Sequence, residues 1–121
     1  MPTREDGPSQ NGADTLNELD RRNRERYPCL RRPTVRVLAR PSFQPHHAIV
    51  RDVSVRSIGL IVEKSFEPGT ILAVQMRKCH AGFSGILSAQ VQQASSQPDG
   101  TWFLGCTLSR SLTDDEIFQL L

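Results

Sequence analysis

Residues 34–40, with the sequence TVRVLAR, place their side chains alternately on the two sides of an extended chain. One face of the predicted strand carries Val35, Val37 and Ala39, and the other carries Arg36, Leu38 and Arg40. A period of two, rather than three or four, is typical of a β-strand that buries one face. The folded part of the chain is therefore predicted to begin near Pro33 and to begin with a strand.

The same alternation recurs along the rest of the chain. Further strands are predicted at His46–Asp52, Ile58–Lys64, Thr70–Arg77, Phe83–Gln92 and Trp102–Leu108. Turn residues separate them, as in Glu67-Pro68-Gly69 and Pro98-Asp99-Gly100. No connection is long enough for helical crossovers, and closure removes exposed strand edges. The prediction is an all-β fold, a six-stranded antiparallel barrel.

The period changes near the C-terminus. Thr113 and Glu116 have the spacing of a capping box, and acidic residues fill the first turn after Thr113. Ile117, Leu120 and Leu121 would then form one apolar face. A short C-terminal helix within residues 112–121 is predicted to cover an opening of the barrel.

A length of 121 residues allows one domain. Residues 1–20 are polar and acidic, and we expect them to be a disordered tail or a short helix. The domain is predicted to span residues 21–121, with an arginine arm at 21–33, the barrel at 34–109 and then the helix. The formal net charge of +2 excludes a strongly basic chromatin-type protein.

Cysteine spacing and the N-terminal sequence bear on the compartment. Cys29, Cys79 and Cys106 are odd in number and far apart, which indicates neither disulfides nor a structural metal. No apolar signal segment or membrane span is found, so a cytoplasmic location without a membrane span is expected. No motif of nucleophilic, metal-dependent or phosphate-loop catalysis is present, so we expect no catalytic residues, no metal and no cofactor.

Two segments have residue types suited to a guanine nucleotide. Arg21–Pro28 holds closely spaced guanidinium groups, which bind phosphate or the O6 and N7 acceptors of guanine in bidentate fashion. Asp52–Ser57 ends one predicted strand and leads into the next, and it offers a carboxylate and two hydroxyls. A carboxylate accepts from the N1 and N2 donors of guanine, and hydroxyls bond phosphate or ribose oxygens. The two segments are therefore chemically complementary to one ligand.

These segments resemble the two motifs of the PilZ domain family. Arg22-Asn23-Arg24-Glu25-Arg26 is similar to its Arg-x-x-x-Arg motif, and Asp52–Ser57 is similar to its Asp/Asn-x-Ser-x-x-Gly motif, with Ser57 in place of glycine. Leu104-Gly105-Cys106 and the Glu67-Pro68-Gly69 turn are also in keeping with the family. The resemblance covers residues 21–121 and implies a barrel that binds cyclic di-GMP.

The resemblance also implies roles for particular residues. The expected ligand-binding residues are Arg22, Arg26, Asp52, Ser54, Arg56 and Ser57. The arm arginines would clamp the phosphates and the Hoogsteen edge of guanine, and the carboxylate would take the guanine donors. Ser54 would bond ligand oxygens, and Arg56 and Ser57 would line the rim. Ordering of the arm on ligand binding would signal to an effector protein that the sequence does not identify.

Two other functions fit parts of the same sequence. A PilZ-fold protein-interaction module that no longer binds the nucleotide is favoured by Ser57. A positive φ at this position would cost serine a tolerable amount, on the order of 1 kcal/mol, but its hydroxymethyl group would obstruct a ligand packed against the backbone there. Nucleic-acid binding by the arginine arm is the least favoured hypothesis, because Tyr27 is the only aromatic residue available there for base stacking.

Overall fold

The computed structural model describes residues 25–76 and 85–121. The predicted tail at 1–20, and Arg22 with it, lie outside the described residues. The strands are β1 (Tyr27–Pro28), β2 (Thr34–Ala39), β3 (His46–Val53), β4 (Ser57–Val62), β5 (Ile71–Met76), β6 (Gly85–Ser96) and β7 (Trp102–Leu108), and the helix is α2 (Asp114–Leu120).

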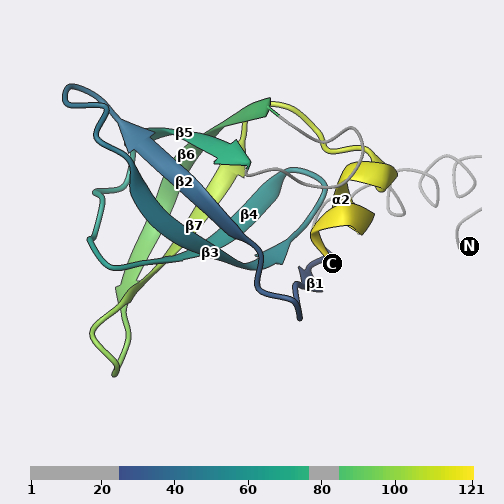
Figure 1. The fold of residues 1–121 in the computed structure, drawn as a ribbon, viewed down its shortest axis with the longest axis horizontal. Helices are drawn as coiled ribbons and strands as arrows, with labels where there is room; N and C mark the ends of the chain where they lie inside the picture. Colours follow the sequence, from purple (N-terminus) through teal and green to yellow (C-terminus); the bar gives the residue numbers. More distant parts are fainter. Residues whose placement is uncertain (1–24, 77–84) are drawn as a thin grey trace, which may run out of the picture.

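Six of these strands form the predicted closed antiparallel barrel (Figure 1). Neighbouring strands pair in the order β3, β2, β5, β6, β7 and β4, and β4 pairs again with β3 to close the sheet. The sequence did not predict β1, which adds to the free part of the β3 edge beyond β2. The fold class expected from the alternating pattern is thus confirmed.

The barrel core consists of the inward faces that the alternation predicted. Side chains with no more than 2 % of their surface exposed include Val37, Val50, Ile58, Leu60, Leu72, Val74, Leu87, Leu104 and Leu108. Cys106 lies among them, and burial raises its pKa to about 12, as expected for a small apolar residue rather than a reactive thiol. Trp102, predicted to share this face, is only partly buried at the start of β7.

Strand β6 is longer than predicted because it contains a β-bulge. The register shifts between Val91, which pairs with Cys106, and Gln93, which pairs with Gly105. The extra residue, Gln92, interrupts the alternation and leaves two consecutive exposed glutamines. The pattern therefore predicted an end to the strand at Gln92, whereas the pairing continues to Ser96.

Helix α2 has the predicted capping box and contacts β3 at one end of the barrel (Figure 1). The Thr113 hydroxyl accepts from the Glu116 backbone N–H at 3.1 Å, and the Glu116 carboxylate accepts from the Thr113 N–H at 2.9 Å. Ile117 and Leu120 are buried against the core. In the part of the chain that the structure describes, no helix has the length and hydropathy to cross a bilayer.

We expect Glu116 to make the stability of this end of the barrel pH-dependent. Hydrogen bonds from Arg110 lower the Glu116 pKa from 4.5 to about 2. A lowered pKa in the folded state stabilises the protein above the unfolded pKa, and this contribution is lost as the pH falls from about 4.5 toward 2. Glu116→Gln should reduce the free energy of unfolding at neutral pH by about 1 kcal/mol, since the pair is partly exposed.

Denaturant unfolding of the wild-type chain and of Glu116→Gln at several pH values measures this effect. The difference between wild type and Glu116→Gln should shrink as the pH falls through the window given above. Glu63→Gln is the matched control, because Glu63 is exposed on the barrel surface. A difference that stays constant with pH would contradict the assignment.

Candidate functional site

A β-bulge in β3 turns two consecutive charged side chains to the outside of the barrel. Val50 pairs with the inward Leu60, but the next paired residue is Asp52, opposite Gly59, so Arg51 is the extra residue. Alternation would place Arg51 and Asp52 on opposite faces of a regular strand. The bulge instead puts a guanidinium and a carboxylate next to each other on the outer surface.

Asp52 is held by two arginines. Its Oδ1 accepts from Arg26 Nη1 at 2.6 Å, and its Oδ2 accepts from Arg51 Nε at 3.0 Å. The residue is only 8 % exposed, whereas the side chains of Arg26 and Arg51 are 45 % and 40 % exposed. Two cations against one anion leave this cluster with a net positive charge. It is therefore an outer-surface site suited to an anion.

The end of the arm is fixed to the barrel by backbone pairing. In β1, Tyr27 pairs with Val53 and Pro28 pairs with Asp52. The Cys29 N–H then donates to the Arg51 carbonyl at 2.9 Å, and the buried Cys29 side chain has its pKa raised to about 11, chiefly by desolvation. This pairing places Arg26 at the β3 edge, within reach of the carboxylate.

An aromatic ring and a glycine complete the cluster. The Arg51 guanidinium carbon lies 3.8 Å from the centre of the Phe103 ring, in cation–π contact. A Cβ on Gly59 would lie 2.6 Å from Asp52 Oδ1 and 2.8 Å from Phe103 Cε1. Only glycine leaves room there for both side chains. We call Arg26, Arg51, Asp52, Gly59 and Phe103 the Asp52 cluster.

The two serines of the predicted motif form a separate hydrogen-bonded turn. Ser54 is fully buried, its hydroxyl is hydrogen-bonded to that of Ser57, and its N–H donates to the Ser57 carbonyl at 2.9 Å. Among described residues other than glycine, only Arg32 and Phe43 have a positive φ. Ser57 therefore begins β4 without a positive φ, so the backbone strain that such a φ would cause is absent at Ser57.

The remaining predicted site residues are not part of the Asp52 cluster. Arg56 is exposed at the turn between β3 and β4, and its Nε donates to the Leu108 carbonyl at 3.3 Å. Arg56 thus reaches toward the end of β7. Arg22 lies outside the described residues.

Sequence reasoning missed Arg51, Gly59 and Phe103. A glycine inside a strand often marks a close approach of another group, so Gly59 carried a usable signal. Arg51 and Phe103 are far apart in the sequence and meet only because β3, β4 and β7 are neighbours in the barrel. No local pattern marks that contact.

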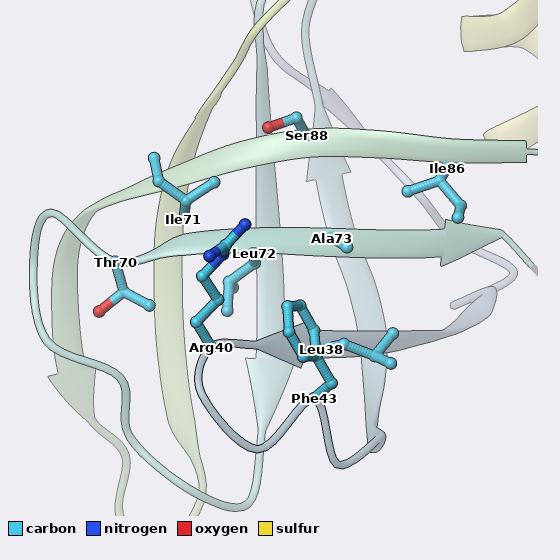
Figure 2. A pocket seen from close by; sticks show the side chains of 9 residues that line it. All are labelled: Leu38, Arg40, Phe43, Thr70, Ile71, Leu72, Ala73, Ile86 and Ser88. Atoms are coloured by element: carbon cyan, nitrogen blue, oxygen red, sulfur yellow. The ribbon is translucent and has the colours of Figure 1, made fainter.

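An apolar hollow lies on a different part of the barrel surface (Figure 2). It has a volume of about 380 Å³ and is lined mainly by apolar side chains of β2, β5 and β6. In Figure 2, Phe43 lies beside Leu38, and Ile71 and Ile86 flank the hollow. Arg40 is its only charged lining residue, so the hollow is poorly suited to a dianion. Within residues 25–76 and 85–121, no group of histidine, cysteine or acidic side chains is placed to hold a metal ion.

The fold and the Asp52 cluster define a small antiparallel β-barrel with a cationic site on its outer surface. The chain matches no protein-family model, no curated protein and no solved structure.

Proposed function

We propose that this chain is a PilZ-like receptor for cyclic di-GMP that signals to an effector protein through its arginine arm. The observation that carries the proposal is the contact between Arg26 of the arm and Asp52 of the barrel, 2.6 Å apart. The two predicted motifs are 26 residues apart at these positions, yet they meet at one point on the surface.

The charges of the cluster support a doubly negative ligand. Cyclic di-GMP carries two phosphates and two guanines, and guanidinium groups bind both phosphate oxygens and the guanine O6 and N7. Arg26 and Arg51 each use one nitrogen on Asp52, and an arginine has five N–H donors. Each carboxylate oxygen can also accept a second hydrogen bond, so Asp52 can take a guanine donor without releasing its arginines.

The path of the chain supports a route from ligand to effector. Residues 21–25 of the arm lead directly into Arg26, and the next residue, Tyr27, is paired with Val53 of β3. A ligand that bridges Arg26 and the preceding arginines would fix the arm against the barrel. An arm held in this way would offer the effector a surface that includes the bound ligand.

Calorimetric titration of the purified chain with cyclic di-GMP tests the proposal. We expect a dissociation constant in the micromolar range or tighter, corresponding to about 8 kcal/mol of binding free energy or more. The absence of heat at high ligand concentration would end the proposal.

The second candidate is a PilZ-fold interaction module that does not bind the nucleotide. One observation favours it: the Ser54 hydroxyl is fully buried and hydrogen-bonded to Ser57, so it does not face the outer surface. A ligand that needs Ser54 would have to open this turn first.

Ser57→Gly separates the two candidates. We expect the variant to lose about 1–2 kcal/mol of stability, because it removes the hydroxyl bonded to the buried Ser54 and adds a glycine to a strand. Ser88→Gly is the matched control, since Ser88 is exposed in β6. Denaturant unfolding measures stability, and calorimetry measures cyclic di-GMP binding. A wild-type chain that gives no heat with cyclic di-GMP, together with a Ser57→Gly variant that binds it, would favour the interaction module.

A further inference from the structure

Arg51 is oriented on two sides by the residues around it. Its guanidinium carbon lies 3.8 Å from the centre of the Phe103 ring, a distance that places the guanidinium over the face of the ring. Its Nε donates to Asp52 Oδ2 at 3.0 Å. Phe103 is 8 % exposed although it belongs to an outward-facing row of β7, and Arg51 packs against its ring. The side chain is thus preorganised by a ring below and a carboxylate at one edge.

With one face covered by Phe103, the exposed part of the Arg51 guanidinium is expected to be its opposite face and its Nη edge. The side chain is 40 % exposed although one of its faces is packed on Phe103. Its Nη atoms have no hydrogen-bond partner among the residues that the structure describes. A planar cation held flat, with one face and one donor edge accessible, is a stacking surface for a base.

We propose that Arg51 is a base-stacking residue of the ligand site. A purine stacks with one face on the open face of the Arg51 guanidinium, and the other face of the purine is toward solvent. This inference rests on the proposed function. The base lies on the guanidinium face opposite Phe103, and its donor edge is directed toward Asp52. Guanidinium planes stack on nucleobases, and the face of a purine is recognised without regard to its sequence context.

A competing role for Arg51 is to neutralise Asp52 by charge alone. The two roles differ in what they require of the side chain. Charge neutralisation is satisfied by any cation at position 51, whereas stacking requires a flat, weakly hydrated group. Lysine supplies the charge as a compact, strongly hydrated ammonium and supplies no plane.

Arg51→Lys therefore tests the inference by calorimetric titration with cyclic di-GMP. We expect the variant to bind at least about tenfold more weakly than wild type, with the same dependence on salt because the charge is kept. Arg36→Lys is the matched control and should bind as wild type, since Arg36 is exposed on β2. An Arg51→Lys variant that binds within about twofold of wild type overturns the inference.

A second measurement uses the wild-type chain and so does not depend on the folding of a variant. A base stacked on the guanidinium should move the Arg51 Nε–H resonance upfield on titration with cyclic di-GMP. A wild-type chain that binds without this shift overturns the inference and leaves the proposed function intact. A wild-type chain that does not bind overturns both.

Discussion

Replacing Arg26 with alanine is expected to abolish cyclic di-GMP binding while leaving the barrel folded. Arg26 is the described arm residue that touches the barrel carboxylate, and this contact uses one of its five N–H donors. Charge-assisted hydrogen bonds to a ligand contribute about 1.5–3 kcal/mol each, so loss of two such bonds weakens binding by about 100-fold or more. Stability should change by less than about 1 kcal/mol, because the pair is partly exposed and Asp52 keeps Arg51.

Arg31→Ala is the matched control for this variant. Arg31 lies in the exposed turn that joins β1 to β2. Arg31→Ala removes one positive charge, as Arg26→Ala does. Calorimetry and denaturant unfolding of the three chains separate binding from folding. An Arg26→Ala variant that binds as tightly as wild type would show that the contact with Asp52 is purely structural.

Gly59→Ala is expected to disrupt the Asp52 cluster by displacing the side chains of Asp52 and Phe103. The added methyl group would lie 2.6 Å from Asp52 Oδ1 and 2.8 Å from Phe103 Cε1, closer than real Cβ contacts. Both neighbours are restrained, the carboxylate by two arginines and the ring by the Arg51 stack. We expect a loss of about 1–3 kcal/mol of stability from overpacking, and binding weakened at least tenfold because the carboxylate is displaced.

Gly105→Ala is the control, because Gly105 pairs directly with Gly59 in the barrel. Its Cβ would meet Gln93 Cγ at 3.2 Å and Nε2 at 3.3 Å, and a flexible glutamine can move aside. Its cost should stay below about 1 kcal/mol. Equal stability and equal binding in Gly59→Ala and wild type would rule out the close packing around Gly59.

The barrel was predictable because its signal is repetitive and local. In β4, for example, Ile58, Leu60 and Val62 alternate with Gly59 and Ile61, and the inward set is at most 2 % exposed. Each strand repeats this rule, and the turns carry their own residues, such as Gly69 and Gly100 with positive φ. The capping box likewise predicted the start of α2 at the correct residue.

The site was only partly predictable, for a geometric reason. Residue types pointed to the arginine segment and to Asp52 as candidates, and the resemblance to the Arg-x-x-x-Arg motif singled out Arg26 within that segment. The bulge at Arg51 was not predictable, since a bulge depends on the pairing of β3 with β4 and not on either sequence alone. Phe103 enters through the β4–β7 pairing, and the burial of Ser54 depends on how the turn folds over Ser57.

An NMR titration of the isotope-labelled chain with cyclic di-GMP tests the central claim most directly. The claim is that the ligand binds on the outer face of the barrel, between the arm and the Asp52 cluster. We predict that the largest backbone amide shifts fall at Arg26, Arg51, Asp52, Gly59 and Phe103, with those around Ile71 and Ile86 in the apolar hollow unchanged. A spectrum that does not respond, or shifts gathered in that hollow, would contradict the account.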